Sequence, residues 1–249
     1  MSKPPRLRLD QLLVARGLAE SRARAQALVM AGVVFSGERR LDKPGLAVAE
    51  DAPLDVRGRD HPWVSRGGVK LAAALDHFTI DPTGLICLDV GASTGGFTDV
   101  LLSRGAAKIY AVDVGSGQLA WKLRSDPRVV VLEKTNIRNL DPALLPEPPA
   151  LVVCDVSFIG LALALPPALA LAVPGARLVA LIKPQFEAGR EQVGKGGIVR
   201  DAQVREDVCS RTTAWLAAQP GWRVLGLMQS PLTGADGNIE YLISGAKEA

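Results

Sequence analysis

Four ionisable side chains lie where the sequence predicts strand ends or a helix beside a strand: Lys70, Asp155, Lys183 and Glu240. Asp155 directly follows the apolar run 151–154, and Lys183 directly follows the run 178–182. Sheets built from alternating strands and helices bind ligands beyond the carboxyl ends of their strands, so these groups can meet at one edge. Two lysines and two acids there could move a proton during catalysis. Taken singly, each is more often a solvated charge or part of a structural ion pair.

A glycine-rich turn follows the strand-like run 86–90. Residues 88–99 read Leu-Asp-Val-Gly-Ala-Ser-Thr-Gly-Gly-Phe-Thr-Asp, which predicts a strand, a turn and a helix. Glycines let a ligand approach the backbone, but the spacing is not G-x-G-x-x-G and no P-loop lysine follows, so dinucleotide and nucleoside triphosphate sites are disfavoured. Asp113 follows Gly91 by 22 residues, at the end of the next predicted strand, where an acid can accept hydrogen bonds from a ribose diol. The two motifs together favour S-adenosylmethionine, against the alternative of a tight turn and a surface acid.

The elements that position these residues alternate between strand-like runs and helical patterns. The runs are residues 86–90, 109–112, 129–132, 151–154, 178–182, 224–228 and 241–244. This alternation predicts an α/β domain with a mostly parallel, doubly wound, Rossmann-like sheet. Residues 156–176 carry no charge over 21 positions, but Pro166, Pro167 and Pro174 interrupt them. We expect a buried loop and a short helix there and no membrane span.

A smaller α+β module precedes this domain. Helical spacing over residues 9–16 and 21–31, with Ser21 as a predicted N-cap, is followed by short strand-like runs at 33–35 and 54–56. A polar stretch then begins at residue 57. We therefore expect a first domain over residues 1–56, a linker over 57–66 and a catalytic domain over 67–249.

Positive charge is concentrated in the first module. Residues 1–40 hold eight Lys or Arg against three acids, a net of +5, whereas the whole chain carries +3, so the remainder is near −2. Arginine and lysine that neutralise phosphates supply most non-specific nucleic-acid affinity, so this module is expected to contact RNA, with a solvated basic face as the alternative. The candidate RNA contacts are Arg6, Arg8, Arg22, Arg24 and Arg66.

The cysteines and histidines favour a reducing compartment and no metal. Cys87, Cys154 and Cys209 are widely spaced, and the first two lie in strand-like runs, which is typical of small buried apolar side chains. His61 and His77 form no recognised metal-ligand spacing with them. The first ten residues lack the apolar core of a signal peptide, so we expect a cytoplasmic protein.

The motifs of the whole chain resemble those of the TlyA-type rRNA methyltransferases, in which an S4-like RNA-binding domain precedes an FtsJ-like 2′-O-methyltransferase domain of the Rossmann-like class I fold. The similarity is carried by residues 21–22, 32–33, 64–71, 89–99, 118–121, 155–159, 183–187, 230–231 and 237–241. The resemblance implies a Lys-Asp-Lys-Glu catalytic tetrad at Lys70, Asp155, Lys183 and Glu240. It also implies S-adenosylmethionine contacts at Gly91, Ser93, Gly95, Gly96, Phe97, Asp113, Asn136, Ile137 and Asp155.

The chemistry of a ribose hydroxyl gives this tetrad a physical reason. The hydroxyl is a poor nucleophile and must lose its proton as it attacks a sulfonium methyl, and Lys183 is the expected general base. Lys70 would favour the neutral form of Lys183 by like-charge repulsion, whereas Asp155 and Glu240 would orient the ammonium groups. Phe158 is either a stacking surface for RNA or a core side chain.

The expected substrate is cytidine in rRNA, free or within a ribosomal subunit. The chain ends at Ala249 without the extension of the longer, dual-specificity relatives, which favours the large subunit (23S rRNA) over 16S rRNA. Two other functions stay open: a membrane-active hemolysin, which the family's other name suggests, and an rRNA-binding assembly factor without catalysis.

Overall fold

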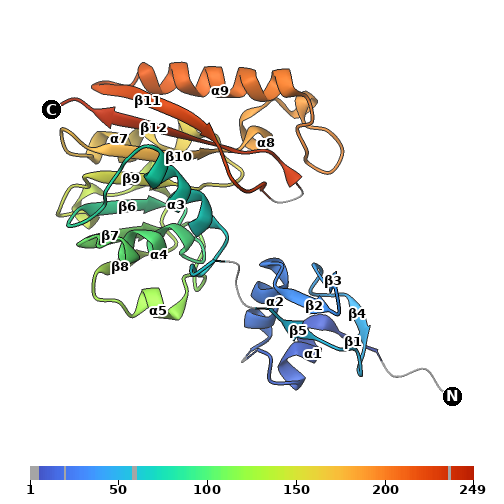
Figure 1. Ribbon diagram of the computed structural model, residues 1–249. Coiled ribbons are helices and arrows are strands. Elements are labelled where there is room, and N and C mark those ends of the chain that lie inside the picture. Colours follow the sequence, from blue (N-terminus) through green and yellow to red (C-terminus); the bar gives the residue numbers. More distant parts are fainter. Residues whose placement is uncertain (1–5, 20, 58–60, 235–236) are drawn as a thin grey trace. The chain divides into compact units, whose positions relative to one another are not determined.

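The computed structural model describes residues 6–19, 21–57, 61–234 and 237–249. The chain divides into two compact units, Met1–Pro62 and Trp63–Ala249 (Figure 1).

The first unit combines two helices with short antiparallel strands. The helices are α1 (Leu9–Ala15) and α2 (Arg22–Met30); the strands are β1 (Arg6–Arg8), β2 (Val34–Ser36), β3 (Arg39–Arg40), β4 (Ala47–Ala49) and β5 (Asp55–Val56). Strand β1 pairs with β4, and β2 lies between β3 and β5. The predicted N-cap is confirmed, because the Ser21 hydroxyl accepts a hydrogen bond from the Arg24 amide at 3.1 Å. Buried leucines and valines from both helices and from β2 and β4 form one small core.

The second unit is built on a seven-stranded sheet in the order β11-β12-β10-β9-β6-β7-β8. The strands are β6 (Ile86–Val90), β7 (Lys108–Val112), β8 (Val129–Leu132), β9 (Leu151–Cys154), β10 (Arg177–Ile182), β11 (Trp222–Gln229) and β12 (Tyr241–Lys247). Strands β8, β7, β6, β9 and β10 are parallel, whereas β12 is antiparallel to both β10 and β11. The predicted fold class, an α/β unit with a mostly parallel sheet, is confirmed.

Helices cover both faces of this sheet (Figure 1). The helical segments are α3 (Gly67–His77), α4 (Gly96–Ser103), α5 (Trp121–Arg124), α6 (Leu161–Ala164), α7 (Pro166–Leu171), α8 (Pro184–Glu187), α9 (Ala202–Ala217) and the short 3₁₀ turns Ile137–Asn139, Pro142–Leu144 and Arg190–Gln192. Alternate strand residues pack with α3, α4 and α5 on one face and with α6, α7 and α9 on the other. Burial on both faces explains why the central strands are almost continuously apolar.

The uncharged segment 156–176 forms two short helices, α6 and α7, whose buried side chains join the core. No helix in the described part of the chain is long and apolar enough to cross a membrane. The predicted burial of the cysteines is also confirmed: all three are buried free thiols, and burial raises the pKa of Cys87 to about 12.

Strands β11 and β12 are longer than the runs 224–228 and 241–244 predicted. Their antiparallel ladder continues from Trp222 opposite Lys247 to Gln229 opposite Tyr241, with a register shift between Val224 and Gly226. The strands predicted from the sequence are too short because glycine, lysine and glutamine, which lie at the ends of the ladder, are weak indicators of a strand.

Candidate active site

A pocket of about 830 Å³ opens beyond the carboxyl ends of β6, β7 and β9. This is the edge where ligands bind in doubly wound sheets, and the volume is in the range of small-molecule sites. Six of the predicted cofactor residues line it: Gly91, Ser93, Asp113, Asn136, Ile137 and Asp155.

The turn after β6 is fixed by Asp113, at the end of β7. The Asp113 carboxylate accepts hydrogen bonds from the Ser93 amide at 2.8 Å and from the Gly115 amide at 2.7 Å. Gly91 has φ +84°, and a Cβ there would lie 2.7 Å from the carbonyl oxygen of Asp155. Only glycine fits this crossing of two strand ends, so the turn stays open toward the pocket.

Three other predicted cofactor residues do not line the pocket. A Cβ on Gly95 would lie 2.2 Å from Leu123, and one on Gly96 would lie 2.2 Å from the Ser65 hydroxyl. Phe97 is buried in the core. These residues therefore shape the turn and the start of α4, and their contact with a cofactor stays a prediction.

Several lining residues were not predicted as cofactor contacts. They are Val90, Val112, Val114, Gln118, Thr135, Arg138, Val156, Ser157, Phe158, Ile159, Gly160, Leu163 and Phe186. Gln118 lies in the motif 118–121, and its side chain accepts a hydrogen bond from the Ser93 hydroxyl at 3.2 Å. A carboxylate that can accept from a diol, apolar walls and a glycine-rich turn together fit an adenosine with its attached amino-acid chain.

Below the turn lies Asp89, a fully buried carboxyl in the middle of β6. Its Oδ2 accepts a hydrogen bond from the Thr98 hydroxyl at 2.7 Å, and its Oδ1 has no hydrogen-bond partner in the described part of the chain. Burial raises the pKa of Asp89 to about 7; the Thr98 hydrogen bond opposes this shift, and the charges of Asp155 and Asp113 add to it.

Lys183 and Asp155 meet at the ends of the adjacent parallel strands β10 and β9. Lys183 Nζ lies 2.6 Å from Asp155 Oδ1 and donates a hydrogen bond to the Ser157 hydroxyl at 2.8 Å. The Lys183 side chain is only 12% exposed, and both of its partners, Asp155 and Ser157, line the pocket.

The second pair, Lys70 and Glu240, is deeper. Lys70, on α3, forms an ion pair with Glu240, whose side chain is 1% exposed. Glu240 immediately precedes β12, and Ile182 pairs with Tyr241 across β10 and β12. Glu240 and Lys183 therefore lie on neighbouring strand ends, and a Cβ on Gly67, at the start of the helix that carries Lys70, would lie 3.7 Å from Asp155.

Phe158 is 90% exposed, so the alternative of a core side chain is wrong. It adopts φ +66°, an uncommon backbone conformation for a residue other than glycine. Its ring contacts that of Phe186 at 4.9 Å between centroids. The two rings stand at the mouth of the pocket, beside Ser157.

In the first unit, the predicted RNA contacts Arg8 and Arg22 converge on the buried carboxylate of Asp10. Both guanidinium groups lie 3.0 Å from it, and Gln26 also donates to it. The hydrogen bonds from Arg8 hold the pKa of Asp10 well below its usual range. The other predicted contact on β1, Arg6, donates to a backbone carbonyl, whereas the Arg24 side chain forms none of the hydrogen bonds or ion pairs found among the described residues.

Residues 63–66, the last part of the predicted linker, belong to the second unit. The Val64 amide donates to Asp99 on α4 at 2.7 Å, and Arg66, a predicted RNA contact, donates to the carbonyl of Thr233 at 3.4 Å. In the described segments, no group of three or more His, Cys, Asp or Glu side chains is arranged to hold a metal ion.

Comparison with known proteins matches both units. Residues 63–247 match the FtsJ-like methyltransferase family, and residues 7–52 match the S4 domain. The 16S/23S rRNA (cytidine-2′-O)-methyltransferase TlyA of Mycobacterium tuberculosis is 50% identical over 96% of this chain and 89% of its own length. Hemolysin A of Brachyspira hyodysenteriae is 40% identical over 95% of this chain and 98% of its own length.

A solved structure extends the similarity to the fold of the whole chain. A hemolysin-named protein from Streptococcus thermophilus aligns with TM-score 0.77 and 46% identity, covering 98% of this chain and 89% of its own.

Proposed function

The chain belongs to the FtsJ-like methyltransferase family and carries an S4 domain, and from this premise we propose that it transfers a methyl group from S-adenosylmethionine to the ribose 2′-hydroxyl of a cytidine in rRNA. The observation that carries the proposal is the pairing of Lys183 with Asp155, which lines the pocket, and of Lys70 with Glu240, which lies at the neighbouring strand end.

Lys183 is the proposed general base. Its Nζ is confined by Asp155 and Ser157, so a neutral amine there is aimed at one place rather than sampling many rotamers. When bound, S-adenosylmethionine would supply an electrophilic methyl group on a sulfonium. Lys183 would take the proton of the ribose hydroxyl as this oxygen attacks, and Asp155 would stabilise the ammonium that forms.

Lys70 has a different role in this proposal. Glu240 is buried and pairs with it, so the Lys70 side chain is held in place. A fixed ammonium beside the reacting hydroxyl would stabilise the alkoxide that develops in the transition state. The two lysines thus divide the work between proton acceptor and electrostatic stabiliser.

The cofactor would lie in the pocket with its ribose diol on Asp113 and its adenine near Asn136 and Ile137. The exposed ring of Phe158, supported by Phe186, would stack on the target base. The S4 domain would contact rRNA phosphates through Arg8, Arg22, Arg24 and Arg6, and the catalytic unit through Arg66. An enzyme with such a substrate works in the cytoplasm.

The hemolysin names of two relatives suggest a membrane-active role as a second function. A pore-forming or lytic activity would use neither the pocket nor the paired lysines, so no feature of the site favours it. An assembly factor without catalysis would likewise leave the buried Lys70–Glu240 pair unexplained.

The test is transfer of labelled methyl from S-adenosylmethionine to unmodified ribosomal subunits, with the labelled nucleoside identified and 23S and 16S rRNA separated. We expect 2′-O-methylcytidine in 23S rRNA from the wild type. Lys183→Ala should lower the rate by roughly 10²- to 10⁴-fold, the contribution of general base catalysis, and leave cofactor binding by calorimetry unchanged.

Lys195→Ala is the matched control, because Lys195 is an exposed lysine outside the pocket and should transfer methyl at the wild-type rate. Label in no RNA would leave a binding protein as the function. Label in 16S rRNA alone would reverse the proposed subunit preference.

A further inference from the structure

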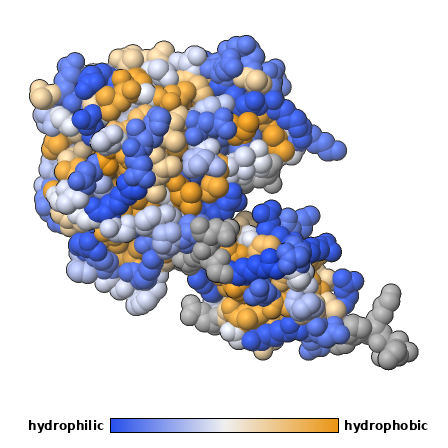
Figure 2. Space-filling model, viewed as in Figure 1, coloured by the Kyte–Doolittle hydropathy of each residue, from blue (hydrophilic) through white to orange (hydrophobic). Residues whose placement is uncertain are grey.

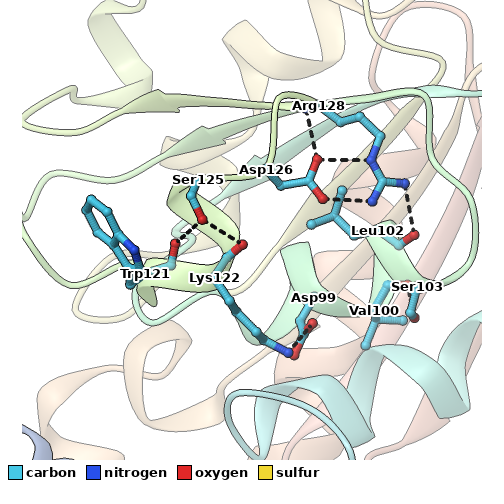
Figure 3. A network of polar contacts seen from close by, with 9 residues as sticks. All are labelled: Asp99, Val100, Leu102, Ser103, Trp121, Lys122, Ser125, Asp126 and Arg128. Atoms are coloured by element: carbon cyan, nitrogen blue, oxygen red, sulfur yellow. Dashed lines mark hydrogen bonds and ion pairs between the residues drawn. The ribbon is translucent and has the colours of Figure 1, made fainter. Parts of the chain in front are cut away.

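Trp121 is an exposed aromatic side chain for which methyl transfer gives no reason. It is 78% exposed at the start of α5, whereas Trp222 in the same unit is 5% exposed. Figure 3 shows its indole pointing away from the side chains of Lys122 and Asp99. Tryptophan is highly buried on average, so an indole left this exposed at a fixed place is a candidate contact for a partner.

The helix that carries Trp121 is rigidly attached to the catalytic unit. Leu119 and Leu123 are buried and pack against Gly95, in the turn that begins α4. Lys122 pairs with Asp99 on α4 at 2.9 Å. Three residues before Trp121, Gln118 lines the cofactor pocket. The indole is therefore presented on a fixed support close to the turn that shapes the proposed cofactor site.

Two ion pairs of the same segment, at Lys122 in α5 and at Arg128 in the connection to β8, expose their cations and shield their acids. The Lys122 side chain is 54% exposed and its partner Asp99 only 10%. Arg128 is 42% exposed and Asp126, its partner, is 21% exposed. These two pairs are drawn in Figure 3. A molecule that approaches this surface meets the ammonium and guanidinium groups before the carboxylates.

We propose that Trp121, Lys122 and Arg128 form a second RNA-binding surface, in which the indole stacks on an unpaired nucleobase and the two cations contact the phosphates of the same strand. Aromatic rings flanked by cations suit single-stranded RNA, because every base has a face to stack and every linkage a negative charge. A ribosomal protein that bound Trp121 by an apolar contact alone would not require the exposed Lys122 and Arg128. This inference rests on the proposed rRNA substrate.

The test compares full-length Trp121→Ala and Trp121→Phe with the wild type in methyl transfer to ribosomal subunits. Trp121→Ala should raise KM for the RNA substrate roughly tenfold, with kcat and cofactor affinity unchanged, because stacking contributes to binding and not to the chemical step. Trp121→Phe keeps an aromatic face and should restore KM to within about threefold of the wild type. Leu144→Ala removes another exposed apolar side chain of the second unit, in the connection leading to the amino end of β9, and should not change KM.

Two further measurements separate the possible partners. The affinity of Trp121→Ala for protein-free 23S rRNA should fall by the same factor by which its KM rises. In the double variant Lys122→Gln/Arg128→Gln, the slope of log affinity against log salt concentration should fall by about 1 to 2, because each cation accounts for one phosphate contact. Glutamine can still donate to Asp99 and Asp126, so the fold is kept. Unchanged KM in Trp121→Ala overturns the proposal. A raised KM of Trp121→Ala for ribosomal subunits with unchanged affinity for protein-free rRNA also overturns it, because this result would assign the surface to a ribosomal protein. No methyl transfer by the wild type would refute the proposed function instead.

Discussion

Asp89 makes the stability of the catalytic unit depend on pH in a way that one substitution removes. Its carboxyl is fully buried, and among the residues that the structure describes only Thr98 forms a hydrogen bond with it, through Oδ2. Asp89→Asn keeps the size of the side chain and an acceptor for the Thr98 hydroxyl, but it cannot ionise. The variant therefore isolates the cost of a buried charge.

The sign and size follow from the pKa of Asp89, about 7 in the folded protein against an ordinary value of 3.8. Below pH 3.8 the carboxyl is protonated in both the folded and the unfolded protein. Between pH 3.8 and 7 only the unfolded chain loses the proton, so the wild type loses stability as pH rises, by up to about 1.4 kcal/mol per pH unit. From pH 5 to pH 8 this amounts to about 2.5 kcal/mol, a loss that Asp89→Asn escapes.

The assay is urea unfolding followed by tryptophan fluorescence at pH 5, 6, 7 and 8. All four tryptophans lie in the second unit, at positions 63, 121, 215 and 222, so the signal reports that unit alone. At each pH we subtract the unfolding free energy of the wild type from that of Asp89→Asn. The prediction is tested by how this difference changes with pH. A difference that stays constant from pH 5 to pH 8 would refute a buried, protonated Asp89.

Two other perturbations test the turn and the first unit. Gly91→Ala should weaken S-adenosylmethionine binding at least tenfold in calorimetry, because the added Cβ would lie 2.7 Å from the Asp155 carbonyl oxygen. Gly117→Ala is the control: Gly117 also has a positive φ, but its Cβ would meet no atom within 4 Å, so this variant should retain the wild-type affinity. Asp10→Ala should speed amide hydrogen exchange in α1 and α2 and not in residues 63–249, because two arginines and Gln26 lose their shared acceptor. Asp42→Asn, an exposed carboxyl of the same unit, is the control, and equal exchange in both variants would contradict the role of Asp10.

Features that depend on local sequence could be predicted. An apolar run followed directly by an acid or a lysine places Asp155 and Lys183 at strand ends, and parallel strands bring these ends together. Asp113 was found in the same way. Each of these positions can be predicted from two rules: the residue pattern of a strand, and the binding of ligands at the carboxyl edge of the sheet.

Features that depend on tertiary contacts could not be predicted. Asp10 counted in the sequence only as one acid among many arginines, yet burial makes it the group on which Arg8 and Arg22 converge. The sequence left Phe158 open between a stacking surface and a core side chain, because residue type alone does not fix its exposure or its positive φ. Trp121 stands in the motif 118–121, but only the structure shows that it is exposed and that Lys122 and Arg128 of the same segment are more exposed than their acidic partners.

The position of Glu240 depends on the one reversed strand beside β10. In a wholly parallel sheet, a residue that precedes a strand lies at the edge opposite to a residue that follows one. Because β12 is antiparallel to β10, Glu240, which precedes β12, lies at the same edge as Lys183, which follows β10. A one-residue slip of this ladder would turn every β12 side chain to the other face and carry Glu240 away from Lys70. The fixed ammonium of Lys70 therefore depends on the register of Ile182 with Tyr241 as much as on the two side chains of the pair.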